Sequence, residues 1–207
     1  MGNTIDAKMQ KKREKIMAVA LHLFAVKGYV NTPVRDIIDE SGFGTGTFYK
    51  YFANKEDVLK QLLADFLEQI IASVNNYYKE ESDLYLRFIE TKRVILKEYI
   101  RNEKVAGICC RAAGLSAGID QCLKEFDDKF LLFIGKNIQY GITEGIFRDF
   151  PIMPIANATL ALIKYLVYKW IVLKEITEEE MLDMATSFHQ SLAIGLVIEG
   201  SRGGQAF

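Results

Sequence analysis

The side chains best suited to recognising nucleic acid lie in one short segment, Thr45–Tyr51. It contains the run Thr-Gly-Thr-Phe-Tyr-Lys-Tyr. Small residues at its start allow the backbone to approach DNA closely, while the hydroxyls and the cation suit phosphates and base edges. Phe48 and the following Phe52 are expected to face inward, because a short helix needs an apolar anchor. This pattern predicts a helix that reads DNA.

Residue sets typical of an active site do not stand out. The chain has two histidines and shows no Ser-His-Asp set, phosphate-binding loop or paired-carboxylate motif. We therefore expect no enzyme activity, no catalytic residue, no metal and no cofactor. The adjacent Cys109 and Cys110 fit neither a common disulfide nor the usual spacing of a zinc site. We interpret them, with Cys122, as buried and inert thiols. A redox or metal role is the alternative.

Two short helices separated by a tight turn are expected to position the DNA-reading segment. Val34, Ile37 and Ile38 form the inner face of the first, and Ser41 with Gly42 ends it. Thr32 is predicted to cap this helix, with Pro33 at its first position. Two short helices joined by a glycine-containing turn are typical of a helix-turn-helix. The second helix of such a pair enters the major groove.

Long helices are predicted for the rest of the chain, which makes the fold class all-α. Ile16, Ala20, Leu23 and Phe24 share one face of a first helix that ends at Gly28. Further helices are expected from a cap at Asn54 through residue 74, at 84–101, within 105–118, and at 119–144, 155–174 and 178–198. Thr177 and Glu180 form a capping box for the last one. Residues 155–173 are apolar, but Asn157, Lys164 and Lys169 interrupt them, so a buried helix is favoured over a membrane span.

Charge is distributed unevenly along the chain. Residues 1–60 hold ten Lys and Arg against seven Asp and Glu, a net of +3, which leaves −4 for the remainder. Five basic residues precede position 16: Lys8, Lys11, Lys12, Arg13 and Lys15. This distribution indicates an anionic partner at one end of the molecule. A solvated helix start is the alternative explanation.

Residues 10–60 resemble the TetR (tetracycline repressor-like) family of bacterial regulators. The resemblance rests on Gly42, on the run Gly46-Thr47-Phe48-Tyr49-Lys50-Tyr51-Phe52, and on Lys55-Glu56. The upstream helix, the turn at Gly28 and Thr32 also fit. The chain departs from the family at Gly44, where Ser or Thr often caps the recognition helix. Either Gly44 or Thr45 is then the cap, because glycine is an acceptable but weaker one.

The resemblance implies roles for individual residues of the helix-turn-helix. Tyr49 and Lys55 match positions that usually contact phosphates. Thr45, Thr47 and Lys50 are candidates for facing the groove, and Arg35 for touching the DNA backbone. A surface position without a DNA role is the alternative for each. The corresponding rival function is a helical interaction module whose helix-turn-helix no longer binds DNA.

For the body, the resemblance implies an effector pocket and a homodimer. The expected domains are residues 1–54 for DNA binding, 55–199 for the effector and the dimer, and a disordered tail at 200–207. Candidate pocket residues are Phe88, Tyr99, Phe126, Phe130, Phe133, Tyr165 and Tyr168. Candidate dimer residues are Leu160, Ile163, Val167, Trp170, Phe188, Leu192 and Leu196. Ordinary core packing is the alternative for both sets.

The function expected from these features is that of a cytoplasmic repressor. It would bind a palindromic double-stranded DNA operator as a homodimer, because half-sites one helical turn apart need two recognition helices. A small apolar or aromatic effector would release it. No membrane partner is expected, since the polar N-terminus shows no signal peptide.

Overall fold

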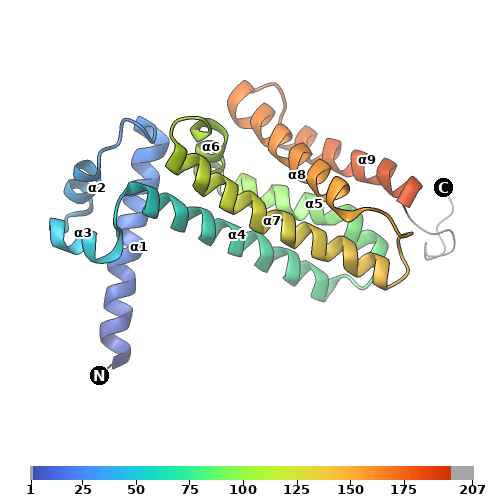
Figure 1. Ribbon diagram of the computed structural model, residues 1–207, viewed down its shortest axis with the longest axis horizontal. Coiled ribbons are helices and arrows are strands. Elements are labelled where there is room, and N and C mark those ends of the chain that lie inside the picture. The colour runs from blue at the N-terminus through green and yellow to red at the C-terminus, as the bar shows by residue number, and fades with distance from the viewer. Residues whose placement is uncertain (1, 197–207) are drawn as a thin grey trace.

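The protein is all-α in the computed structural model, which describes residues 2–196, with side chains from residue 7 onward (Figure 1). The helices are α1 (Gly2–Lys27), α2 (Val34–Ser41), α3 (Thr45–Tyr51), α4 (Lys55–Glu80), α5 (Leu84–Arg101), α6 (Glu103–Ala112), α7 (Ala117–Thr143), α8 (Ile152–Tyr168) and α9 (Glu178–Leu196). A π-helical turn, η1 (Lys169–Leu173), extends α8. The predicted fold class is confirmed. The tail predicted at 200–207 lies outside the described residues.

Helices α1, α2 and α3 form a small unit at one end of the molecule (Figure 1). Glycines at positive φ make both of its turns: Gly28 at 83° ends α1, and Gly42 at 72° ends α2. The prediction that Thr32 caps α2 is wrong. Its hydroxyl is buried and donates to the Gly28 carbonyl at 2.8 Å, and Pro33 occupies the cap position. Thr32 therefore closes the α1–α2 turn.

Helix α4 leaves this unit and runs along the body, packed between α5 and α7 (Figure 1). Its start is fixed as predicted: the Asn54 side chain accepts from the Asp57 amide at 2.8 Å. Its apolar residues recur every four positions and are all buried: Val58, Leu62, Phe66, Ile70 and Val74. Phe66 meets Tyr99 of α5 edge-to-face, at 4.9 Å between ring centroids, and stacks on Phe126 of α7 at 6.0 Å. These rings join three helices in one core.

Helix α8 begins at Ile152, three residues before the predicted start, since the first turn of a helix tolerates Pro154. It packs against α7 and α9, and its Lys164 pairs with Asp127 of α7 at 2.6 Å. The stretch Ile152–Leu173 is long and apolar enough to cross a membrane, by length and composition only. Helices that are buried in a protein core meet the same test, and α8 packs against α7 and α9.

The last helix starts at the predicted capping box. The Thr177 amide donates to the Glu180 carboxylate at 2.7 Å, and the Glu180 amide donates to the Thr177 hydroxyl at 3.2 Å. Helix α9 then packs along α5, so that α8 and α9 together form one side of the body (Figure 1).

Candidate nucleic-acid interface and ligand cavity

Helix α3 is anchored by two buried rings and presents a polar face to solvent. Phe48 and Phe52 are 1% and 3% exposed, which confirms the expected anchor. Tyr49 is 55% exposed, and Thr45 and Lys50 are also exposed. Gly44 holds the cap position in extended conformation without a side-chain bond, so Thr45 is the first helical residue. The outward face of α3 is therefore hydroxyl-rich and cationic.

A basic groove lies between α3 and the first half of α1. Lys8, Lys12 and Lys50 line it with Thr47, and its volume is about 380 Å³. The Lys50 ammonium contacts the Met9 sulfur at 3.9 Å. Within the described part of the chain, no carboxylate pairs with these three lysines. The N-terminal basic cluster thus borders the predicted DNA-reading helix, although the sequence did not place its lysines in the site.

Two other residues predicted to contact DNA, Lys55 and Arg35, already bond to groups of the small α1–α3 unit. Lys55 donates to the carbonyls of Tyr29 at 2.9 Å, Val30 at 3.3 Å and Thr32 at 3.1 Å. Those three bonds use every N–H of the ammonium. The Arg35 side chain is 88% exposed and forms a 3.7 Å surface pair with Asp39. Both remain predictions as DNA contacts, and Lys55 has a structural role that the sequence did not indicate.

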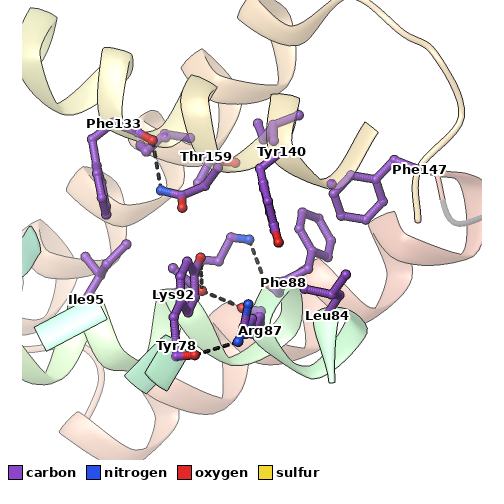
Figure 2. A pocket seen from close by; sticks show the side chains of 15 residues that line it. Tyr78, Leu84, Arg87, Phe88, Lys92, Ile95, Phe133, Tyr140, Phe147 and Thr159 are labelled. Atoms are coloured by element: carbon purple, nitrogen blue, oxygen red, sulfur yellow. Dashed lines mark hydrogen bonds between the residues drawn. The ribbon is translucent and has the colours of Figure 1, made fainter. Parts of the chain in front are cut away.

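A small cavity lies inside the body (Figure 2), beside the C-terminal end of α4, which is the end farther from α3 in Figure 1. Its volume is about 50 Å³. Figure 2 shows Phe133 and Tyr140 of α7 facing Phe88 and Lys92 of α5 across it, with Tyr78 of α4 at its side. Aromatic and aliphatic groups with a few polar ones are typical of a small-molecule site.

Lys92 is the most unusual residue of this cavity. It is 6% exposed, its ammonium donates to the Phe88 carbonyl at 2.7 Å, and it lies 3.8 Å from the centroid of the Phe88 ring. Burial lowers its pKa to about 7. The sequence reading missed Lys92 because lysines are normally exposed. A usable signal existed, since Lys92 interrupts an apolar stripe of α5 that includes Phe88, Ile95 and Tyr99.

The second cation at the cavity, Arg87, has partners. Its guanidinium donates to the Tyr78 carbonyl at 2.5 Å and to the Glu81 carbonyl at 2.6 Å. The Tyr78 hydroxyl in turn bonds the Thr91 hydroxyl at 2.9 Å. Arg87 therefore joins the C-terminal end of α4 to α5, where a cation also suits the helix dipole.

His189 of α9 adds a third nitrogen base close to this region. It is fully buried, its Nδ1 lies 2.8 Å from the Ala185 carbonyl, and its Nε2 has no partner among the described residues. Its ring is 6.0 Å from that of Phe88. Burial, and then the charge of Lys92, lowers the pKa of His189 to about 3, so the ring is neutral at pH 7.

Six of the seven predicted pocket residues are divided between two hollows, and the seventh, Phe130, lines neither. Phe88 and Phe133 line the cavity at Lys92. Four line a second, more open hollow of about 510 Å³ beside α6 and α8: Tyr99, Phe126, Tyr165 and Tyr168. Phe130 is fully buried and packs against the rings of Phe126 and Phe133. The second hollow contains Lys164, but Asp127 already pairs with that lysine.

The structure separates the predicted dimer residues into inner and outer positions. Leu160, Ile163, Val167 and Trp170 are buried inside the protomer, at most 8% exposed. They are therefore core residues here and do not form a surface. Phe188 is 39% exposed, and Leu192 and Leu196 are half-buried. The apolar residues that α8 and α9 expose are Met153, Tyr165, Tyr168, Met184, Phe188 and Ile194.

Cys109 and Cys110 line the second hollow, and none of the three cysteines lines the cavity at Lys92 or the basic groove. Cys109 and Cys110 are partly buried, Cys122 is buried, and all three are free thiols. Burial raises the pKa of Cys109 to about 12 and also raises those of the other two. These thiols stay protonated at neutral pH, which makes them poor nucleophiles.

A helix-turn-helix on a larger helical body with an internal cavity defines a class of ligand-responsive DNA-binding proteins. Residues 16–62 match the family model for bacterial regulatory proteins of the tetR family. A solved TetR-family transcriptional regulator from Syntrophomonas wolfei is 53% identical and superposes with a TM-score of 0.88, over 92% of this chain and 99% of that one. The chain therefore belongs to the TetR family.

Other relatives match more narrowly. The transcriptional repressor KstR2 of Mycobacterium tuberculosis is 34% identical over 68 residues, which is 33% of this chain and 34% of that protein. FadR from Bacillus subtilis, solved in complex with stearoyl-CoA, is 20% identical with a TM-score of 0.75, over 88% of this chain and 98% of that one. The first similarity covers only about a third of each chain, and the second shows the fold alone.

Proposed function

We propose that this chain is a cytoplasmic repressor that binds a palindromic operator as a homodimer and is released by a small apolar or aromatic effector. The observation that carries the DNA part is the exposed face of α3, with Thr45, Tyr49 and Lys50 beside unpaired lysines of α1. Hydroxyls and cations on a major-groove helix supply both phosphate and base contacts.

The effector part is supported by the cavity in the body. Its walls belong to α4, α5, α7 and α8, so a ligand there contacts the helix that enters the DNA-binding unit. The solved relative FadR holds an acyl-CoA, which supports an apolar effector for this chain as well. An effector acts only if it binds the DNA-free arrangement more tightly than the DNA-bound one.

A fluorescence-anisotropy titration tests the DNA part, with a labelled duplex from upstream of the chain's own gene. The expected result is sequence-preferring binding whose log affinity falls with log salt by about 0.9 for each phosphate contact. Lys50→Ala should weaken this binding and reduce the salt slope. Lys97→Ala, which changes an exposed lysine of α5, is the matched control and should have no effect. Binding without sequence preference or salt dependence would exclude the proposal and favour an interaction module.

A further inference from the structure

The cavity at Lys92 carries positive charge and no negative charge. Fifteen residues line it, including Arg87 and Lys92 but no aspartate or glutamate. Arg87 donates hydrogen bonds to two carbonyls at the end of α4. The Lys92 ammonium donates to only one carbonyl, in the middle of α5. An ammonium has three N–H donors, so two of them remain for a ligand.

Lys92 costs the folded protein free energy in this position. A buried cation without a counter-ion is expensive, and an apolar residue of similar size would be more stable there. The side chain does not extend to water, since it is 6% exposed and lies over the Phe88 ring. Nearby His189 is also buried, but its Nδ1 donates to the Ala185 carbonyl, so its unpartnered Nε2 is an acceptor and the donors for an acidic ligand are those of Lys92. A charge retained at such a cost within a cavity indicates a binding role.

The rest of the lining defines the other half of the ligand. Ile95, Phe133 and Phe147 contribute apolar walls, while Asn137 and Thr159 are the neutral polar groups. A cavity of about 50 Å³ holds little more than a few waters, so a ligand must widen it. Tyr140 is 49% exposed at its edge and can turn outward to admit one.

We propose that this cavity binds a monocarboxylic acid with an apolar chain or ring, whose carboxylate pairs with the Lys92 ammonium. The proposal rests on the proposed function, because it names the chemical class of the effector. The ligand's apolar body lies between α5 and α7 and displaces Tyr140. The carboxylate supplies the counter-ion that Lys92 lacks in the described part of the chain.

Isothermal titration calorimetry of the DNA-free protein tests this pairing, with octanoate and 3-phenylpropanoate as probes. Their amides, octanamide and 3-phenylpropanamide, have the same bodies without the charge. Wild-type protein should bind each acid more tightly than its amide. Lys92→Met removes the charge but keeps the bulk, and should weaken acid binding by about 30-fold or more, as expected when a buried charge loses its partner. Amide binding should stay unchanged or improve.

Two controls locate the effect. Lys97→Met, at an exposed site of the same helix, should bind the acids as wild type does. Lys164→Met tests the second hollow, whose lysine is already paired with Asp127. Wild-type affinities equal for acid and amide, or a loss in Lys164→Met rather than in Lys92→Met, would overturn the proposal.

Proton linkage provides a second readout. The groups that face Lys92 are Arg87 on its own helix, Tyr78 from α4, Tyr140 from α7 and His189 from α9. Burial lowers the pKa of Lys92 to about 7, so binding an anion above pH 7 must take up a proton. Affinity for octanoate should fall about tenfold per pH unit above pH 7 in wild type, and stay flat in Lys92→Met. A flat wild-type profile would count against the pairing.

These measurements separate the inference from the proposed function. Acid binding that depends on Lys92 but leaves the DNA complex intact supports the inference and refutes control by this effector. DNA release by some other molecule, in a protein that binds neither acid, supports the proposed function and overturns the inference.

Discussion

Lys55 and Lys92 both donate to backbone carbonyls, but they meet different surroundings. Lys55 satisfies all three of its N–H groups on the α1–α2 turn and lies 4.5 Å from the Tyr29 ring centroid. Lys92 has one carbonyl and is enclosed by the body. The first lysine therefore stabilises a fold element. The second destabilises the protein in its unliganded state.

The cost of Lys92 should be visible in the pH dependence of stability. Its pKa is about 7 in the folded protein and 10.5 in the reference state, so between these values the unfolded chain holds a proton that the folded chain has released. The free energy of unfolding should therefore rise between pH 7 and pH 9, by about 2–3 kcal/mol from this group. Below pH 7 the cost of burying the charge is fully present.

Urea unfolding of wild type and Lys92→Met at a series of pH values measures this contribution. The variant should be more stable at pH 7, and its advantage should shrink toward pH 9. Arg87, Tyr78, Tyr140 and His189 are present in both proteins, so the comparison isolates the substitution at position 92. A constant difference across this range would show that Lys92 titrates normally.

Lys55→Met should destabilise the DNA-binding unit through loss of its bonds to three carbonyls. The expected cost is about 1.5–3 kcal/mol, the range for hydrogen bonds that involve a charged group. Thermal unfolding followed by circular dichroism checks it, and exposed Lys50→Met serves as the control with unchanged Tm. A Lys55→Met protein with wild-type Tm but weakened DNA binding would instead identify Lys55 as a phosphate contact.

At the scale of helices, the C-terminal end of α7 is fitted closely to the segment that follows it. A Cβ atom at Gly141 would lie 2.3 Å from the Phe147 ring, nearer than any real contact. Phe147 packs against Phe88 at 4.6 Å and lines the cavity (Figure 2). The glycine thus allows the chain to fold back and close the cavity wall.

Gly141→Ala should displace Phe147 and lower the free energy of unfolding by about 1–3 kcal/mol. Gly135→Ala on the same helix is the matched control, since its Cβ would meet Ile152 at an ordinary 3.7 Å. The control should gain up to about 1 kcal/mol from helix propensity. Equal stabilities of the two variants in urea unfolding would contradict the close packing.

The sequence predicted where helices begin and end more successfully than it predicted which side of each helix is buried. Caps at Asn54 and Thr177 and the turn at Gly28 were identified because a local hydrogen bond or a positive φ determines each of them. The inner and outer sides of α8 were not distinguished, because Leu160 and Tyr165 are both apolar in a one-dimensional pattern. Only packing against α7 and α9 makes the first buried and the second exposed. Lys92 was missed because lysines are normally exposed, whereas this one is buried.

Across the whole molecule, α4 connects the two candidate sites. It begins at Lys55 beside the α1–α2 turn and ends next to Tyr78 at the cavity (Figure 1). Its 26 residues span roughly 39 Å at 1.5 Å each. An ion pair of 2.7 Å between Lys60 and Glu125 links it to α7, which forms the opposite cavity wall. Under the proposed function, we expect a ligand that separates α5 from α7 to shift α4 and the recognition helix with it.

Such a shift affects operator binding only if two recognition helices act together in a dimer. The surface that would form this dimer can be tested directly.

Phe188 on α9 is exposed beside Met184 and belongs to the outer face of the α8–α9 side. Phe188→Asp places a charge on that surface. It should weaken dimerisation by about 30-fold or more, the effect of losing a hot-spot residue. Leu132→Asp is the control, because Leu132 is a 63% exposed apolar residue of α7 and belongs to neither α8 nor α9. Sedimentation equilibrium should show monomers for Phe188→Asp and dimers for the control, and operator affinity should fall only in the first. A Phe188→Asp protein that remains dimeric would place the interface on another face.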